Sequence, residues 1–510
     1  MIDIKSILLC ACAAVPVSLP AYGGDLVIMH TNDTHGNMVA ERAKDRGGVE
    51  RRKVLIDSIR GAERNTLLVD AGDDVQGFLY FTLYKGEVEY EAMNRLGYEF
   101  TVPGNHEFDN GLQALADNYR RLDAVKLCAN YDFSATPVAG LTQEYAIKEY
   151  EGKRIALIGV GCQPKGMIAP ECYGDMVYSD AVSVADSIAG MLKSQGRADY
   201  AIVISHLGYE IDRPELPSDS LLAISSSNVD VIIGGHSHTV IDPAAAGHPR
   251  YVFKNRNGED VLVAQTGKWG EYLGKITIDL DNLDALPRYE LLPVDSRYDG
   301  RCDAGFSAWL QSYTDGVERL KREVIGHSSA AYECGKMNPL SNWVADAVYD
   351  IASGLTERKI DLAIINKGGI RQPLPEGDVS LGLVMTMLPF TNSVVVMEID
   401  GKSLAEGLDV MASRGGDAVS RQASARIEGG RAVDVTVGGE PLDYGRKYVV
   451  ATIDYLANGG DNMASFATGG KVIAKSEEQL KNEIINYIKK LTAEGRAITP
   501  DTAERMYKTN

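Results

Sequence analysis

Two things are missing from most of this chain: long apolar runs and an excess of positive charge. Beyond the N-terminal residues, no stretch reaches the roughly 20 apolar residues that cross a bilayer, which predicts a protein without a transmembrane segment. Lys plus Arg number 52 against 71 Asp plus Glu, so the net charge is −19. This charge argues against a nucleic-acid polymer as partner. A small anionic substrate remains compatible, because bound divalent cations would reverse the local field.

Cysteine is scarce, and its count depends on where the mature chain begins. Lys5 precedes the apolar run Ile7 to Val17, and Ala21-Tyr22-Gly23 supplies small residues of the kind that a signal peptidase reads. We therefore predict a signal peptide over residues 1–23 and an exported protein, periplasmic or at the cell surface. A lipoprotein box at Leu9 to Cys12 is the weaker alternative, since its apolar run is too short. An odd number of cysteines then remains, and whether Cys162 and Cys172 are bridged stays open; the five are Cys128, Cys162, Cys172, Cys302 and Cys334.

The 510 residues are too many for one ordinary core, and the sequence divides into two alternating regions. In the first, apolar runs rich in Val, Ile and Leu are separated by helical patterns, one of which contains Leu55, Ile56 and Ile59. Fully apolar strands between helices predict a central sheet covered on both faces. The runs are Leu26 to Met29, Thr66 to Val69, Ile155 to Val160, Ala201 to Ile204, Val229 to Ile233 and Val261 to Ala264.

A connecting helix and a second α/β region follow. Apolar residues from Phe306 to Val324 recur at helical spacing, which predicts a long helix with Gly326 as its stop. We assign residues 24–300 to the first domain, 301–326 to the linker helix and 327–510 to the second domain. Ser476 and Gln479 form a capping-box pattern before a closing amphipathic helix. The strands expected in the second domain are Leu362 to Ile365, Val394 to Ile399, Val433 to Val437 and Tyr448 to Thr452.

Five short segments contain most of the residues able to bind a metal. Five of the eight histidines lie in them, and four of these have a carboxylate, an Asn or another His within two residues. Carboxylate oxygens mixed with imidazole nitrogens suit Zn²⁺ or Mn²⁺ better than Ca²⁺. Several of these residues follow an apolar run directly, where ligands gather in layered α/β folds. The segments are Asp33 to His35, Asp70 to Asp73, Gly104 to Asp109, His206, and Gly235 to His238.

The order of these segments, D-x-H, G-D, G-N-H-(E/D) and G-H-x-H, resembles the calcineurin-like metallophosphoesterase superfamily. The fuller strings His30 to Gly36 and Pro103 to Asp109 resemble the bacterial periplasmic 5′-nucleotidase and UDP-sugar hydrolase family. The resemblance implies an α/β fold: a four-layer metallophosphoesterase sandwich followed by a mixed α/β substrate-binding domain. It also implies two divalent metal ions, Zn or Mn, that activate water for attack on phosphorus.

Carried over by position, the resemblance assigns a role to each motif residue. Asp73 would bridge the two ions, and His106, oriented by Asp109, would face the transferring phosphoryl group. Asp70 and Asp74 are assigned to capping or support, and Glu107 stays ambiguous. The first ion would be held by Asp33, His35, Asp73 and His238, and the second by Asp73, Asn105, His206 and His236.

The second half resembles the substrate-binding domain of the same family through three strings, Asn366 to Arg371, Leu388 to Phe390 and Tyr455 to Asp461. The resemblance implies that Phe390 and Tyr455 sandwich a base, that Asp461 accepts from ribose hydroxyls, and that Asn366 with Arg371 holds base and phosphate. The alternative is that both aromatics belong to the core.

The second half also departs from the family pattern. Lys367 stands where relatives usually have Gly, and Tyr455 replaces the commoner Phe. Glu333 to Lys336 lacks an Arg that many relatives have, so either the phosphate contacts are weaker or Lys336, Arg414 or Arg421 substitutes.

Together these features predict an exported hydrolase that removes phosphate from nucleoside 5′-monophosphates, with UDP-sugars as further substrates. The nearest alternative is a 2′,3′-cyclic-nucleotide 2′-phosphodiesterase with 3′-nucleotidase activity. A sulfur-compound hydrolase and a nucleotide-binding protein without turnover are the other two. The sequence leaves the oligomeric state open.

Overall fold

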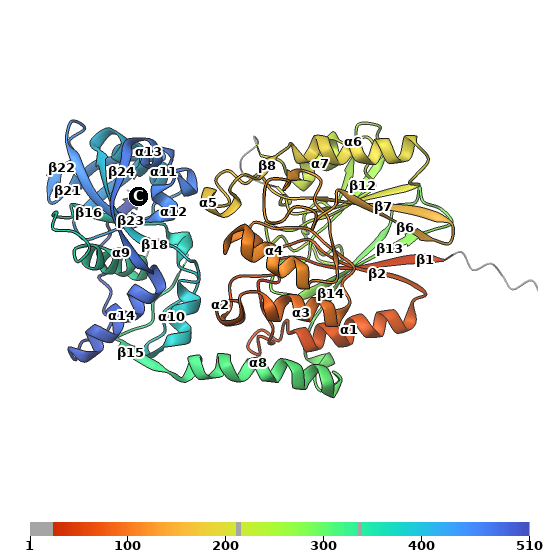
Figure 1. Cartoon of the computed structure of the whole chain (residues 1–510), viewed down its shortest axis with the longest axis horizontal. Coiled ribbons are helices and arrows are strands. Elements are labelled where there is room, and N and C mark those ends of the chain that lie inside the picture. Colours follow the sequence, from red (N-terminus) through yellow and green to blue (C-terminus); the bar gives the residue numbers. More distant parts are fainter. Residues whose placement is uncertain (1–23, 211–215, 335–338, 509–510) are drawn as a thin grey trace, which may run out of the picture.

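The computed structural model describes residues 24–210, 216–334 and 339–508. The predicted signal peptide lies outside the described residues. Figure 1 shows two lobes, one from the N-terminal and one from the C-terminal part of the chain, connected by the helix α8 (Ala304–Arg322). Within the described residues, no helix combines the length and apolarity needed to cross a membrane.

The first lobe contains two six-stranded sheets. In the first sheet, parallel strands β1 to β4 are extended by antiparallel β13 and β14. Its order is β14 (Arg288–Pro293), β13 (Tyr272–Asp279), β1 (Asp25–Thr31), β2 (Asn65–Asp70), β3 (Phe100–Thr101), β4 (Val125–Lys126). The second has the order β11 (Val252–Lys254), β12 (Asp260–Ala264), β10 (Val231–Ile233), β9 (Tyr200–Ser205), β7 (Lys153–Val160), β6 (Tyr145–Tyr150). Strands β5 (Tyr131–Asp132) and β8 (Val177–Tyr178) pair separately.

The two sheets face each other, and helices cover their outer faces. Leu26 and Ile28 of β1 belong to the same core as Ile202 of β9, between the sheets. Val27 and Met29, on the opposite face of β1, pack with the helices of the first sheet. This arrangement is the four-layer sandwich that the family resemblance implies. The apolar runs by themselves predicted one central sheet, and that prediction is wrong, because the second apolar face of a strand can be covered by another sheet as well as by helices. The helices are α1 (Val49–Ala62), α2 (Leu79–Tyr84), α3 (Glu87–Leu96), α4 (Gly111–Arg121), α5 (Pro170–Tyr173), α6 (Ala181–Ser194) and α7 (Asp219–Ser225).

The connecting helix is shorter than predicted. Asp303 caps its start by accepting from the amide of Phe306 at 2.8 Å. It ends at Arg322, because Val324–Ser328 forms strand β15, paired with β17 (Gly377–Ser380). Gly326 is thus a strand residue rather than a helix stop. A Cβ at this position would lie 2.4 Å from Cγ2 of Ile488, so a close helix explains the glycine.

The second lobe is built on a five-stranded and a four-stranded sheet. The five-stranded order is β19 (Ala418–Val419), β16 (Leu362–Ile365), β23 (Lys447–Ile453), β18 (Ser393–Asp400), β24 (Gly470–Gln479). The four-stranded order is β22 (Glu440–Pro441), β21 (Arg431–Val437), β20 (Ala423–Glu428), β25 (Met506–Lys508). The helices are α9 (Pro339–Ala352), α10 (Leu381–Met387), α11 (Gly401–Ser413), α12 (Asp454–Ala457), α13 (Ala464–Gly469) and α14 (Leu480–Ala493).

The closing helix α14 begins where the sequence predicts, but its capping box does not form. Ser476 lies in strand β24, where its hydroxyl donates to Glu483 and accepts from the amide of Glu478. Gln479 occupies the cap position without a side-chain hydrogen bond. The strand continues to Gln479, which carries Ser476 away from the helix start.

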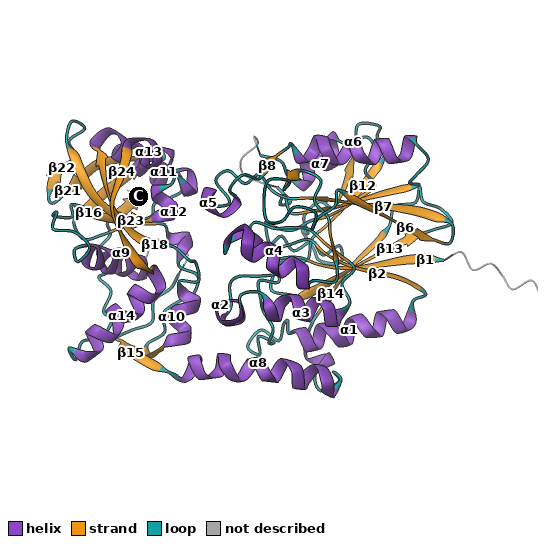
Figure 2. Cartoon of the chain, viewed as in Figure 1, coloured by secondary structure: helices purple, strands orange, loops and turns teal. Residues whose placement is uncertain are grey.

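The lobes touch directly as well as through α8. Helix α10 of the second lobe packs against α8 and α2, and Met385 of α10 joins the core of the first lobe. Nearer the cavity between the lobes, the hydroxyl of Thr391 donates to the carbonyl of Asp109 at 3.3 Å. In Figure 2 the loops at one end of the first lobe's strands face the second lobe.

Candidate active site

The predicted metal ligands come together from loops at the carboxyl ends of parallel strands in both sheets. Asp33 follows β1, Asp73 follows β2, His206 follows β9 and His236 follows β10. Five of the seven predicted ligands have backbone φ angles between 50° and 74°, a region unusual for residues other than glycine. Such strained backbone persists only where the surroundings hold it. These five are Asp33, His35, Asp73, His236 and His238.

Asp33, His35 and His238 form a first group, whose possible donor atoms all lie within 4.8 Å of one another. Nε2 of His35 lies 3.0 Å from Nε2 of His238, and Nε2 of His238 lies 3.4 Å from Oδ1 of Asp33. Asp33 and His35 are buried. Burial, the largest effect, lowers the pKa of His35 to about 3, so its imidazole is neutral and offers a lone pair.

Asp73, His206 and His236 form a second group. Nδ1 of His206 lies 2.6 Å from the carbonyl of Ala71, to which it donates. Its Nε2 lies 3.1 Å from Oδ2 of Asp73; burial lowers the pKa of His206, but this carboxylate outweighs burial and raises that pKa to about 10. A buried imidazole and a buried carboxylate this close together fit the two sides of a bound cation, which would take the place of the proton between them. Nδ1 of His236 lies 2.7 Å from Oδ1 of Asn105, which brings the fourth predicted residue to the same place.

A third group, His35, Asp73 and His106, lies between the other two. It shares His35 with the first group and Asp73 with the second, so it links the two groups. Burial raises the pKa of Asp73, but the imidazoles of His206 and His106 outweigh it and hold that pKa well below its usual range. A carboxylate that stays ionised beside several imidazoles fits divalent metal ions.

Glu107, whose role the sequence left ambiguous, links two of the loops through hydrogen bonds. Its carboxylate accepts from the backbone amides of Asp73 and Asp74, both at 2.9 Å, and of Gly104 at 2.6 Å. Asp70 accepts from the hydroxyl of Thr31 and from the amide of Gly72. Glu107 and Asp70 therefore support the metal-binding loops through hydrogen bonds. The sequence alone could not distinguish this role from metal binding.

His106 faces the second lobe. Its Nδ1 lies 2.9 Å from Oδ2 of Asp109, the partner that the sequence predicts. Its ring stacks against Phe390 of the second lobe, with centroids 6.1 Å apart and an interplanar angle of 28°. The guanidinium of Arg371 lies over the ring of Phe390, 5.2 Å from its centroid.

A cavity of about 390 Å³ between the lobes contains the remaining predicted residues. Asn105, His106 and Asp109 line it from the first lobe. Sequence reasoning missed Glu171, Asn392, Asp454 and Lys475, which also line it, because each is an ordinary polar residue outside the motifs. Predicted residues that line it from the second lobe are Asn366, Arg371, Phe390, Tyr455 and Asp461.

Asp461 is held from several directions. Its Oδ1 accepts from the Tyr455 hydroxyl at 3.0 Å, and its Oδ2 accepts from Nδ2 of Asn366 at 2.8 Å. Nη1 of Arg414 donates to its carbonyl at 2.7 Å. Lys367 donates to the carbonyls of Arg414 and Gly416. The hydroxyl of Tyr455 and the side chain of Lys367, both departures from the family pattern, thus brace this loop.

The residues expected to substitute for the Arg that the sequence lacks differ in their positions and contacts. Arg414 is tied to Asp417 and to the Asp461 carbonyl, so it supports the loop. Arg421 pairs with Asp350 at 2.9 Å and does not line the cavity. Lys336 lies outside the described residues.

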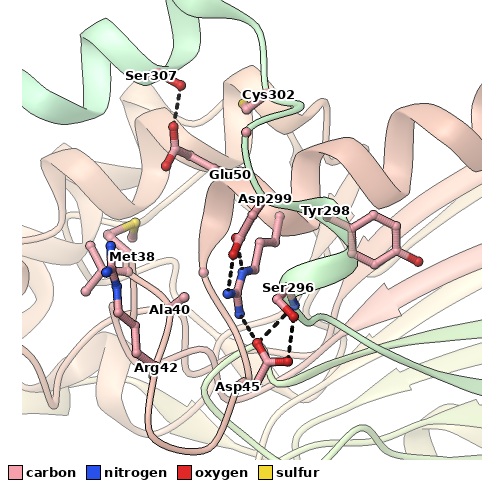
Figure 3. Close-up of a pocket in the computed structure, with 14 residues that line it drawn as sticks. Met38, Ala40, Arg42, Asp45, Glu50, Ser296, Tyr298, Asp299, Cys302 and Ser307 are labelled. Carbon is pink, nitrogen blue, oxygen red and sulfur yellow. Dashed lines mark hydrogen bonds and ion pairs between the residues drawn. The ribbon is translucent and has the colours of Figure 1, made fainter.

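A larger cavity, of about 770 Å³, lies away from the metal-binding groups. Figure 3 shows its lining between the loop that contains Arg42 and Asp45 and the segment from Ser296 to Ser307. Arg51 bonds to Asp299 through two nitrogens, at 2.6 and 2.9 Å, and pairs with Asp45 at 3.2 Å. This paired network fixes the segment before α8.

None of the five cysteines among the described residues forms a disulfide, and this includes Cys162 and Cys172, whose pairing the sequence left open.

Imidazoles and carboxylates converging at strand ends, beside a cavity with an Arg and a carboxylate-bound His, define a metal-dependent phosphoesterase. The model of the calcineurin-like phosphoesterase family matches residues 26–240, and that of the 5′-nucleotidase C-terminal domain matches 321–468. The chain therefore combines a calcineurin-like phosphoesterase domain with a 5′-nucleotidase C-terminal domain, and several of its relatives are named 5′-nucleotidases.

Several known proteins are similar along most of the chain. The 5′-nucleotidase of Rattus norvegicus is 28% identical, covering 90% of this chain and 87% of the relative. The trifunctional nucleotide phosphoesterase YfkN of Bacillus subtilis is 26% identical over 94% of this chain, which spans only 35% of YfkN. The structure of a 5′-nucleotidase precursor from Thermus thermophilus is 29% identical, with a TM-score of 0.80, covering 95% of this chain and 99% of that one.

One further structure has the same fold but is named for a different activity. The sulfate thiohydrolase SoxB of Thermus thermophilus is 17% identical, with a TM-score of 0.69, covering 96% of this chain and 98% of that one. The fold alone therefore does not select the substrate.

Proposed function

We propose that this chain releases phosphate from nucleoside 5′-monophosphates with two divalent metal ions, Zn or Mn. The observation that carries the proposal is the stacked contact between His106, beside the metal-binding groups, and Phe390, in the wall of the cavity between the lobes. A nucleotide has an anionic phosphate and an aromatic base. The contact brings a site for the phosphate, beside the metal-binding groups, next to a site for the base, in the cavity wall.

The donor atoms divide into two ligand sets. We assign Asp33, His35 and His238 to one ion, and Asn105, His206 and His236 to the other. Asp73 contributes to both sets. When bound, such ions lower the pKa of water and polarise phosphoryl oxygens.

His106 and Arg371 would act on the phosphoryl group. Asp109 holds Nδ1 of His106, which leaves Nε2 free to donate a hydrogen bond to a phosphoryl or leaving oxygen. Arg371 would bind non-bridging oxygens through its planar guanidinium. Both side chains line the cavity.

The second lobe would bind the nucleoside. Phe390 and Tyr455 would stack on the base, with about 1–3 kcal/mol per stacked base. Asp461, braced by Tyr455, Asn366 and Arg414, would accept from the ribose hydroxyls. Domain 24–300 would thus supply the chemistry and domain 327–510 the nucleoside site, with residues 301–326 as the linker.

A panel of substrates tests this proposal. Phosphate release is measured for AMP, 3′-AMP, 2′,3′-cyclic AMP and UDP-glucose, with Zn²⁺, Mn²⁺ or Mg²⁺ and with chelator as control. We expect the highest kcat/KM for AMP, measurable cleavage of UDP-glucose and no activity with chelator. Preference for the cyclic nucleotide would favour the 2′,3′-cyclic phosphodiesterase instead. Binding of AMP without release of phosphate would mean a binding protein.

Export is part of the proposal. Residues 1–23 would be removed, leaving a mature chain that begins at Gly24 in the periplasm or at the cell surface. Mass spectrometry of the protein from the cell envelope tests this, and retention of residues 1–23 would contradict it.

A further inference from the structure

Two lysines of the first lobe lie over the same aromatic ring near the metal-binding groups. Nζ of Lys268 is 4.2 Å from the ring centroid of Trp269, and Nζ of Lys44 is 5.1 Å from it. The edge of Phe78 packs against this ring, with centroids 6.0 Å apart. An aromatic face attracts an ammonium group without neutralising its charge. Both lysines therefore stay available to an anion.

The loop that carries Lys268 is bonded to the metal-binding loops. The amide of Trp269 donates to the carbonyl of Asp33 at 2.7 Å, and Nδ2 of Asn37 donates to the carbonyl of Trp269 at 3.2 Å. Nδ2 of Asn32 donates to the carbonyl of Gly267 at 2.8 Å. Hydrogen bonds on both sides of Lys268 thus fix its backbone next to a predicted metal ligand.

The charge around Lys268 is not balanced by close carboxylates. Among the described residues, no ion pair within 4.0 Å joins Lys268, Lys44 or Arg371 to a carboxylate. Burial lowers the pKa of Lys268, and repulsion by Arg371 and Lys44 lowers it further, while Glu271 and Asp33 act in the opposite direction. Arg371 comes from the second lobe, so like charges approach each other across the space between the lobes.

We propose that Lys268 is a further phosphate-binding residue, which contacts non-bridging oxygens of the substrate phosphoryl group from the first lobe, opposite Arg371. Like charges without close counterions are unfavourable until an anion enters among them. Lys44, which is exposed and lies over the same Trp269 ring, adds positive charge nearby. The ligands are phosphate monoesters and inorganic phosphate. The inference rests on the phosphohydrolase part of the proposed function and not on the identity of the nucleoside.

The test compares Lys268→Met and Lys268→Gln with Lys268→Arg. For Met and Gln we expect KM to rise about tenfold for both AMP and p-nitrophenyl phosphate, with kcat nearly unchanged. The inhibition constant of inorganic phosphate should rise by the same factor, and calorimetric titration of phosphate should show the same loss of affinity. Lys268→Arg keeps the charge and should restore most of the binding.

Lys148→Met is the matched control. Lys148 also lies over an aromatic ring, 6.0 Å from the centroid of Phe100, but it is paired with Glu99 at 2.9 Å. Its KM and phosphate affinity should stay at the values of the unmodified protein. Unchanged phosphate affinity in both Lys268→Met and Lys268→Gln would overturn the inference, as would a rise in KM for AMP alone. If the protein cleaves p-nitrophenyl phosphate but no nucleotide, the proposed function fails and the Lys268 comparison still stands.

Discussion

His106, in the first lobe, contacts a side chain of the second lobe beside the metal-binding groups. Asp109, three residues further along the same chain segment, fixes one ring nitrogen, and Phe390 from the other lobe packs on the ring face. The ring can therefore keep one orientation beside the metal-binding groups while remaining part of the cavity wall. Its position suits stabilisation of developing charge, for which orientation in advance is decisive.

Replacing His106 by Ala should lower kcat by about 10²–10³ and leave the metal content unchanged. Phosphate release and elemental analysis of the same samples measure both quantities. His248→Ala is the control, since His248 hydrogen-bonds to the carbonyl of Pro249, packs against Tyr251 and belongs to none of the candidate metal-binding groups among the described residues. Loss of bound metal in His106→Ala would instead assign His106 to the ligands, as its group with His35 and Asp73 permits.

Glu89 gives a pH-dependent prediction at the same scale. It is buried in α3, neither carboxyl oxygen has a hydrogen-bond partner, and burial raises its pKa to about 8. An acid with a raised folded-state pKa stabilises the fold fully below its unfolded value near 4.5, and this contribution is lost as pH rises through about 8. Glu89→Gln should therefore gain melting temperature relative to the unmodified protein between pH 5 and pH 9.

Differential scanning fluorimetry at several pH values measures this gain. Glu91→Gln, at a partly exposed position of the same helix and paired with Arg95, is the control for removing a carboxylate from α3. A flat profile for Glu89→Gln would show that its carboxyl group is ionised in the folded protein.

At the scale of elements, the site depends on how closely the loops after neighbouring strands approach each other. A Cβ on Gly104 would lie 2.2 Å from Oδ1 of Asp73 and 2.6 Å from its backbone nitrogen. Glu107 accepts from both of these loops at once. The spacing of the loops, and with it the geometry of the metal-binding groups, therefore requires glycine at this position.

Gly104→Ala should destabilise the protein by about 1–3 kcal/mol and weaken metal binding, because the two loops must separate. Thermal melting and metal titration measure the two effects. Gly61→Ala in α1 is the control: no atom lies within 4 Å of its added Cβ, so it should be neutral or stabilise by about 0.4–1 kcal/mol. Equal metal affinity in Gly104→Ala and the unmodified protein would mean that the loops tolerate the shift.

At the scale of the whole molecule, neither lobe contains a complete site. The metal-binding groups belong to the first lobe, and Phe390, Tyr455 and Asp461 belong to the second. Contacts of α10 with α8 and α2, and the bond from Thr391 to Asp109, hold the lobes in this relation. Figure 1 shows the second lobe opposite the loops of the first, with α8 as the covalent link.

Phe390→Ala separates the two halves of the proposed site. KM for AMP should rise about 5–150-fold, which corresponds to the loss of one stacked base, while KM for p-nitrophenyl phosphate should change little. Tyr444→Ala, at an exposed position of the same lobe, should alter neither value. Equal losses on both substrates would contradict a role for Phe390 in stacking.

The sequence by itself determined many of the central strands, the order of the metal-binding motifs and the pairing of His106 with Asp109, but not strands such as β6, β13, β14 and β24. These depend on local patterns: apolar runs, ligand types next to strand ends, and two residues three positions apart. Even the departures at Lys367 and Tyr455 could be noticed there. The contacts that these two side chains make could not be predicted. Lys367 bonds to the carbonyl of Arg414, which is distant along the chain, and Tyr455 bonds to Asp461, whose position depends on the shape of a loop.

Only the tertiary structure decided where α8 ends and which polar residues line the cavity. A strand that is apolar on both faces does not reveal whether a sheet or a helix covers it, so the two sheets of the first lobe followed from the family resemblance and not from the apolar pattern. Gly326 does not end a helix, because the chain at this point is already in strand β15, which pairs with β17. Lys268 has no motif to mark it, and its importance arises from a Trp ring beneath it and an Arg from the opposite lobe.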